Sequence, residues 1–133
     1  MDHYKKGEVK EVALALPFSE NLVEGITVMR IKPHSKIANI TGFAEKKLKQ
    51  DDCKRIVFGG IGAACSKTIS CVEVFKRKFP MPLYQVTKIV YRRIEEYWDP
   101  NSTDDIPLER LKVNRDAPAI YILLSKESLE TEP

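Results

Sequence analysis

The stretch Arg55-Ile56-Val57-Phe58-Gly59-Gly60-Ile61-Gly62 determines how the rest of the sequence is interpreted. Its first four residues form a short apolar run rich in β-branched and aromatic side chains, which predicts a strand. The glycines interrupt this run, and the spacing predicts a helix over about 63–79. The apolar face of that helix has positions spaced four, three, three and four residues apart, namely Cys65, Ile69, Val72, Phe75 and Phe79.

A second strand-to-helix pair precedes this stretch, and two strands follow it. Residues 27–32 are β-rich, and after Pro33 a helix is expected over about 36–50 with Ser35 as its N-cap. Residues 84–98 predict a long strand, and 119–124 are apolar at both parities, as in a strand buried on both faces. The order β-α-β-α-β-β predicts a two-layer α/β domain with a mixed four-stranded sheet. The right-handed crossover rule places the first two strands parallel, with both helices on one face. The last two strands are expected to form an antiparallel hairpin across a loop at 99–107.

The length of 133 residues suits one domain. We expect a flexible N-terminal arm over 1–26, the folded nucleic-acid-binding domain over 27–126 and an acidic tail over 127–133. The N-terminus lacks the apolar run of a signal peptide, and no apolar run approaches the roughly 20 residues that cross a bilayer. We therefore expect no membrane partner.

The formal net charge of +3 is unevenly distributed along the sequence. From Arg30 to Arg93 there are fifteen basic and four acidic residues, a net charge of +11, whereas the preceding and following segments carry −2 and −6. Such asymmetry is typical of proteins that bind a polyanion, although a solvated basic surface would show it too.

Cysteines and histidines provide no catalytic or metal-binding pattern. The three cysteines, Cys53, Cys65 and Cys71, have no Cys-x-x-Cys spacing and are interpreted as small, semi-buried hydrophobic residues of a reducing compartment. The two histidines, His3 and His34, stand outside any known ligand or nucleophile motif. We expect no catalytic residue, no metal and no small-molecule cofactor.

The glycine run after Phe58 fails two nucleotide-binding patterns. Lys67 lies five positions after Gly62, whereas a Walker loop has its lysine directly after the last glycine. A dinucleotide fingerprint would need a glycine or alanine where Cys65 stands and an acidic residue in the region of 80–87. Two interpretations stay open: a loop whose backbone approaches a phosphate, with Lys67 adding charge, or a tight turn that binds nothing.

A second basic helix start follows the strand at 27–32. It reads Lys32-Pro33-His34-Ser35-Lys36, and in a parallel β-α-β unit it lies at the same sheet edge as the glycine run. We therefore expect Lys32, His34, Lys36 and Lys67 to converge on one surface. Arg92 and Arg93 of the long hairpin would extend that surface, which favours nucleic-acid binding.

Several of these segments together resemble one known family. They are Ser35-Lys36-Ile37-x-Asn39, then Ile56-Val57-Phe58-x-Gly60-x-Gly62-x-Ala64-x-x-Lys67-x-x-Ser70-Cys71-x-Glu73, then Lys76-Arg77-Lys78 and the strand from Pro118 to Ser125. This pattern resembles the Alba family. It is most similar to the branch that forms the larger Alba-type protein subunit of eukaryotic ribonuclease P and ribonuclease MRP. The resemblance covers roughly residues 27–126.

The resemblance implies an Alba-like fold, also called initiation factor 3 C-terminal-like, and a chain without catalytic activity. It implies a subunit that binds ribonuclease P or MRP RNA, forms a heterodimer with the smaller Alba-type subunit, and acts in tRNA 5′-end maturation and rRNA processing in the nucleus and nucleolus. The contact positions that it implies are Ser35, Lys36, Asn39, Gly60, Gly62, Lys67, Arg92 and Arg93.

The sequence departs from the family pattern at one position, and two other functions are compatible with it. Many relatives carry arginine where this sequence has Ala63, which places more of the phosphate binding on Lys36, Lys67 and the hairpin. The alternative function is a stand-alone Alba-type protein that binds messenger RNA or chromatin, as a homodimer. A third is a small enzyme that binds a nucleotide or phosphometabolite at the glycine run.

Overall fold

Two compact units make up the chain in a computed structural model that describes residues 4–11, 15–100 and 109–129. The first, here the core unit, comprises Ala15–Val90 and Pro118–Pro133. The second, here the hairpin unit, comprises Met1–Leu14 and Tyr91–Ala117. These boundaries differ from the expected division into an arm, a domain over 27–126 and a tail. Two long strands account for the difference, because each of them contributes residues to both units.

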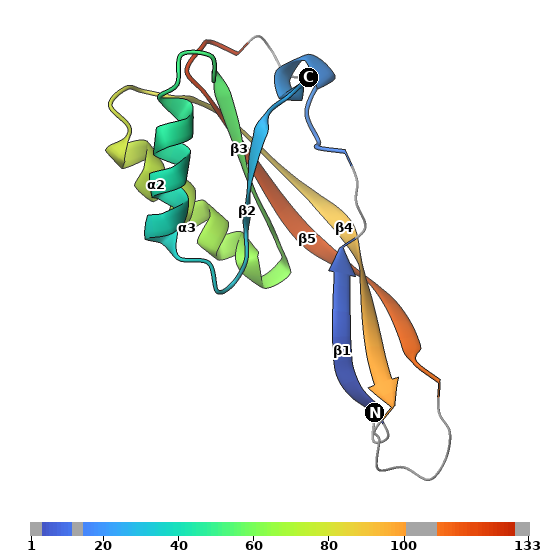
Figure 1. Ribbon diagram of the computed structural model, residues 1–133. Coiled ribbons are helices and arrows are strands. Elements are labelled where there is room, and N and C mark those ends of the chain that lie inside the picture. The colour runs from blue at the N-terminus through green and yellow to red at the C-terminus, as the bar shows by residue number, and fades with distance from the viewer. Residues whose placement is uncertain (1–3, 12–14, 101–108, 130–133) are drawn as a thin grey trace. The chain divides into compact units, whose positions relative to one another are not determined.

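The sheet of the core unit has the predicted mixed pairing (Figure 1). Strand β2 (Thr27–Ile31) runs parallel to β3 (Arg55–Ile61), and β3 is antiparallel to β5 (Leu111–Ser125). The other neighbour of β5 is β4 (Tyr84–Pro100). The strand order β2-β3-β5-β4 therefore confirms the mixed four-stranded sheet expected from the element order.

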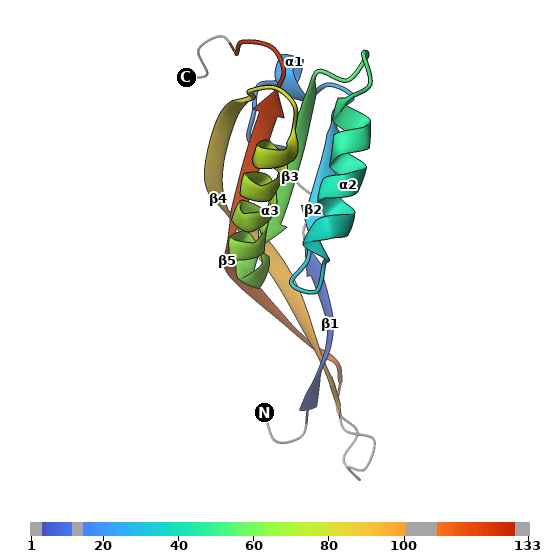
Figure 2. The same cartoon turned by 90° about the vertical axis from the view of Figure 1, so that its left-hand side faces the viewer.

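Two helices lie on one face of this sheet, as predicted (Figure 2). They are α2 (Ile37–Leu48) and α3 (Cys65–Lys78), the second entered through a short 3₁₀ turn, η1 (Gly62–Ala64). Apolar side chains of both helices pack against β2, β3 and β5, with Phe58 and Phe75 in ring contact at 5.4 Å. This cluster forms the larger part of the hydrophobic core.

The predicted apolar face of α3 is partly wrong. Ile69 is 46% exposed, and the buried residues of the helix are Thr68, Cys71, Val72 and Phe75. Thr68 enters the core because its hydroxyl donates a hydrogen bond to the Ala64 carbonyl at 2.8 Å, so no polar group is left unsatisfied. The buried stripe is therefore rotated toward Thr68 and Cys71, and Ile69 is left at the surface.

Strand β5 contributes to a core on each of its faces, as its double-parity apolar pattern predicts. Ile120, Ile122 and Leu124 face the helices, whereas Ala119, Tyr121 and Leu123 join a second cluster. Residues 16–26, with the short helix α1 (Glu20–Val23) and the buried Phe18, cover that second face. Residues 15–26 thus contribute packed structure where a flexible arm was expected.

The hairpin unit contains a strand that the sequence pattern did not reveal. Strand β1 (Tyr4–Glu11) pairs antiparallel with β4, from Tyr4 opposite Pro100 to Glu11 opposite Ile94. Cross-strand ion pairs join β4 to the segment that begins at Arg110; these are Arg110–Asp99 (2.9 Å), Lys112–Glu95 (3.1 Å) and Arg115–Glu96 (2.8 Å). The predicted loop at 99–107 lies outside the described residues except for Asp99 and Pro100, which belong to β4.

The chain segment after β5 fastens the end of α2. The Lys126 ammonium donates hydrogen bonds to the carbonyl oxygen of Leu48 (2.7 Å), in the last turn of α2, and to that of Gln50 (3.1 Å), just beyond the helix. The last carbonyl groups of a helix have no partner within the helix, so the bond to Leu48 satisfies one of them. The expected acidic tail is described only as far as residue 129. Within the described part of the chain, no helix has the length and apolar character needed to span a membrane.

Candidate nucleic-acid interface

Two strand-to-helix junctions meet at one edge of the core-unit sheet, as the sequence predicts. In the parallel pair, Ile31 of β2 lies opposite Gly60 of β3, so the two strands end almost level. Residues 32–36 then lead into α2, and Gly62–Ala64 lead into α3. We call these two segments, with the first turns of the helices that follow, the junction surface.

The first junction carries most of the exposed polar groups of this surface. Lys32, His34, Lys36 and Asn39 are all exposed there, and Ser35 is partly buried. Ser35 is not the N-cap that was predicted: its hydroxyl accepts a hydrogen bond from the Lys32 amide at 2.9 Å, and Lys36 occupies the cap position. The Ser35 amide in turn donates to the Lys32 carbonyl at 3.0 Å. Ser35 therefore closes a tight turn that presents the two lysines.

Two of the three glycines in the run allow close packing of the backbone, and only one is placed where a ligand could approach. Gly59 and Gly60 are buried within β3. A Cβ on Gly60 would lie 2.0 Å from the Thr68 hydroxyl and 2.9 Å from the Ala64 carbonyl oxygen, so glycine is required for α3 to approach the strand. Only Gly62, whose φ is +60° and whose Cβ direction is open, turns the chain at the surface. Of the two predicted glycine contacts, the structure therefore leaves Gly62 accessible and buries Gly60.

Lys67 joins the two junctions physically. It extends from the first turn of α3, and its ammonium donates hydrogen bonds to the carbonyl oxygens of Pro33 (2.6 Å) and Ser35 (2.9 Å). The predicted convergence of Lys67 with the first junction is therefore confirmed. Its side chain is partly buried by these contacts, so Lys67 braces the loop that carries Lys32 and Lys36.

Arg92 and Arg93 belong to β4 of the hairpin unit, and their environments differ. Arg92 is only 9% exposed and interacts within the structure, whereas Arg93 is exposed. The hairpin unit has eight basic and ten acidic residues, a net charge of −2. The core unit has fourteen basic and nine acidic residues, a net charge of +5. The basic excess seen in the sequence therefore belongs to the core unit.

Two exposed residues that sequence reasoning did not assign to the site lie close to it in the fold. Arg30 is exposed near the end of β2, and Phe43 is 56% exposed on α2. Phe43 follows Lys36 and Asn39 by seven and four residues, a spacing that puts all three on one helix flank. This spacing was present in the sequence and would have identified Phe43.

Two ionisable groups on α2 and α3 have pKa values shifted by their surroundings. Burial raises the pKa of the Cys71 thiol, and the nearby charge of Lys67 partly offsets this rise. A hydrogen bond and the charge of Lys49, 2.7 Å away, lower the pKa of the Glu45 carboxyl. Among the described residues, no group of three histidine, cysteine, aspartate or glutamate side chains is placed to hold a metal ion.

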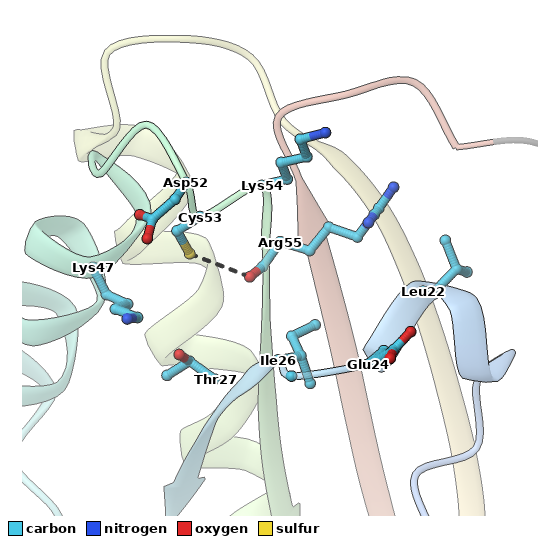
Figure 3. A pocket seen from close by; sticks show the side chains of 10 residues that line it. Leu22, Glu24, Ile26, Thr27, Lys47, Asp52, Cys53, Lys54 and Arg55 are labelled. Atoms are coloured by element: carbon cyan, nitrogen blue, oxygen red, sulfur yellow. Dashed lines mark hydrogen bonds between the residues drawn. The ribbon is translucent and has the colours of Figure 1, made fainter.

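A separate pocket of about 290 Å³ lies at the opposite end of β2 and β3, where these strands begin (Figure 3). Its lining mixes basic and acidic side chains, and the Cys53 thiol donates a hydrogen bond to the Arg55 carbonyl at 3.5 Å within it. The Arg55 side chain also approaches Glu127, at 3.9 Å. This pocket is not part of the junction surface.

Comparison with known proteins identifies the family. The Alba family model matches residues 27–93, which include both junctions. The chain is 36% identical over 130 residues to the ribonuclease P protein subunit p25-like proteins of Bos taurus and Homo sapiens, covering 98% of this chain and 78% of each relative. It is 38% identical over 121 residues to the ribonuclease P protein subunit p25 of Rattus norvegicus, covering 86% of this chain and 60% of the relative. By the match to the family model and by this sequence identity, the chain belongs to the Alba family.

Proposed function

We propose that this chain is a non-catalytic, RNA-binding subunit of a ribonuclease P or ribonuclease MRP ribonucleoprotein. The observation that carries the proposal is the junction surface, where two basic helix starts lie side by side and Lys67 links them. The names of its relatives, which are ribonuclease P subunits, indicate the particle. Its role would be in tRNA 5′-end maturation and rRNA processing, in the nucleus and nucleolus.

Recognition is expected to use phosphates and the shape of the RNA. Lys32, Lys36 and the exposed Arg30 are cations at one end of the core unit, and the unit carries a net charge of +5. Contacts of this kind release counterions from the nucleic acid, so the affinity should fall steeply with salt. Ala63 is exposed and the Cβ direction of Gly62 is open, so a phosphate has room to approach the start of α3.

A partner protein is part of this proposal, and the core unit offers an apolar surface for it. Ile69 of α3 is 46% exposed and Ile89 of β4 is 68% exposed. The flank of α3 that carries Ile69 faces β4, because Lys76 donates a hydrogen bond to the Gln85 side chain at 2.8 Å. Ile69 lies about 10 Å before Lys76 along the helix, and Ile89 lies about 13 Å beyond Gln85 on the returning strand.

Since α3 and β4 run in opposite directions, these spacings lead us to place Ile69 and Ile89 on the same flank. This pair of exposed aliphatic side chains, flanked by polar Lys76, Gln85 and Thr87, is the surface that we assign to the smaller Alba-type subunit. Changing both isoleucines to glutamate should abolish pairing while the chain stays folded, because neither side chain belongs to the buried core.

The experiment that tests the proposed function is affinity purification of the full chain from cells, with identification of the bound RNA and proteins. Recovery of ribonuclease P or MRP RNA with a second small Alba-type protein supports the proposal. Recovery of messenger RNA or chromatin with only copies of this chain would instead support the stand-alone alternative.

A binding assay with purified components makes the test residue-specific. Lys36→Ala should weaken binding to structured RNA, whereas Arg77→Ala is the matched control, since Arg77 is an exposed cation in the last turn of α3. Equal affinity of the two variants and the natural protein at moderate salt would rule out the junction surface as the contact.

A further inference from the structure

The exposed flank of α2 carries an aromatic ring among cations. Lys36, Asn39, Phe43 and Lys47 follow one another at spacings of three, four and four residues, which places them along one side of the helix. Lys36 and Lys47 lie about 10 Å and 6 Å from Phe43 along the helix axis. Lys36 and Asn39 are exposed, Lys47 is partly buried, and the Phe43 side chain is 56% exposed.

The fold gives no reason for a phenylalanine at this position. The buried residues of α2 are Thr41, Ala44 and Leu48, and Ile37 and Ile40 pack partly against the same cluster. Phe43 belongs to neither core cluster. A single exposed apolar side chain is common in proteins, so exposure alone would carry no conclusion.

The preceding residue supplies a second, independent observation. Gly42 lies in the interior of α2, where glycine weakens a helix relative to alanine. Its φ is not positive, and a Cβ would meet nothing within 4 Å, so neither backbone conformation nor packing requires glycine. A surface that leaves both a bare backbone and an uncovered ring is suited to a flat ligand that approaches closely.

We propose that Phe43 stacks on an unpaired base of the bound RNA, with Lys36 and Lys47 contacting the phosphates on either side and Gly42 leaving room for the approach. This inference rests on the proposed function and deepens it, because it adds recognition of an unpaired nucleotide to recognition of the duplex. Aromatic side chains stack on splayed bases in this way in many RNA-binding proteins. Cations flanking the ring favour RNA over an apolar protein surface as the occupant.

The test uses the full chain and two hairpin RNAs of equal length, one a continuous duplex and the other with an internal loop carrying 2-aminopurine. For Phe43→Ala we expect about 5- to 150-fold weaker binding to the looped RNA, the range found for one base stacked on an aromatic ring. Binding to the duplex and the salt slope should not change, because Phe43 contacts no phosphate. Quenching of the 2-aminopurine by the natural protein should be lost in the variant.

Conservative variants separate stacking from general apolar contact. Phe43→Tyr should retain the preference for the looped RNA, and Phe43→Leu should lose it, because leucine has no ring. Tyr84→Ala, which removes another exposed aromatic side chain of the core unit, is the matched control. Since Phe43 is outside the core, thermal unfolding of its variants should match that of the natural protein.

Three outcomes would overturn the inference. The first is equal binding of Phe43→Ala and the natural protein to both RNAs, and the second is full retention by Phe43→Leu. The third is loss of a co-purifying protein with no change in RNA affinity, which would make Phe43 a protein contact. If Lys36→Ala still weakens duplex binding in these cases, the proposed function stands without this inference. If the natural protein binds neither RNA, the proposed function itself fails.

Discussion

The ammonium of Lys67 lies 2.6 Å from the carbonyl oxygen of Pro33, so a side chain of the second long helix holds the loop that precedes the first one. A lysine at a predicted phosphate site would ordinarily be assigned a direct contact. Lys67 instead donates hydrogen bonds to two carbonyl groups, and these bonds fix the positions of Lys32 and Lys36.

Lys67→Met should therefore weaken RNA binding through the shape of the loop. Methionine keeps most of the length of the side chain but removes the charge and the donors, and we expect a loss of about 1 kcal/mol in unfolding free energy. RNA affinity should fall while its salt slope stays the same, whereas Lys36→Ala should lower the slope by about one contact. Anisotropy titrations at several salt concentrations measure both. A lowered slope for Lys67→Met would mean direct phosphate contact.

Gly60 and Gly42 make a matched pair for substitution by alanine. At Gly60 the added methyl group would clash with Thr68 and with the backbone of Ala64, so Gly60→Ala should lower the unfolding free energy by about 1–3 kcal/mol. At Gly42 the methyl group enters open space within a helix, so Gly42→Ala should raise it by about 0.5–1 kcal/mol. Denaturant unfolding followed by circular dichroism distinguishes the two, and equal effects would contradict the described packing of α3 on β3.

Arg92 and Arg93 should respond differently to substitution although they are neighbours. Arg92 is buried and interacts within the structure, so Arg92→Ala should lower the unfolding free energy by about 1–3 kcal/mol. Arg93 is exposed, and Arg93→Ala should change it by less than about 0.5 kcal/mol. Thermal melts of the two variants provide the comparison. Equal melting temperatures would show that the burial of Arg92 has no energetic consequence.

The Cys71 thiol should react with a thiol reagent only when the protein unfolds. Its side chain is fully buried, and burial raises its pKa, so the reactive thiolate is disfavoured in the folded protein. The unfolded chain ionises this thiol first as the pH rises, so its contribution to stability is present below about pH 8.5 and declines above it. Mass spectrometry after timed alkylation should find Cys53 and Cys65, both partly buried, modified before Cys71. Early modification of Cys71 would be inconsistent with its position in the core.

Much of the core unit could be predicted because its local patterns agree with its tertiary environment. The apolar run at Ile56-Val57-Phe58 and the double-parity run at 119–124 both occupy strands buried on two faces, where nearly every residue must be apolar. The convergence of the two junctions followed from the parallel pairing alone. Strand β1 could not be predicted in this way, since Lys5, Lys6, Glu8 and Lys10 make its sequence polar and its partner, β4, is more than eighty residues away.

The predictions for the site were wrong at residues whose role depends on a tertiary contact that the sequence does not reveal. Gly60 was interpreted as a phosphate contact, but the position requires glycine because the Thr68 hydroxyl occupies the place where a Cβ would lie. Ser35 was expected to cap α2, but its hydroxyl accepts the Lys32 amide in a preceding turn. Each role depends on a contact that becomes visible only when the helices are placed against the strands.

The position of β5 within the core-unit sheet has a consequence for how the protein is made. Strand β5 is synthesised after the other strands of this sheet, yet it lies between β3 and β4 and supplies apolar residues to both cores. A nascent chain that ends before residue 118 therefore leaves one edge of β3 without its partner strand, and both cores without the side chains that β5 supplies. Folding of the core unit must wait until β5 has been synthesised, so the nascent polypeptide is a natural client for chaperones that shield hydrophobic segments.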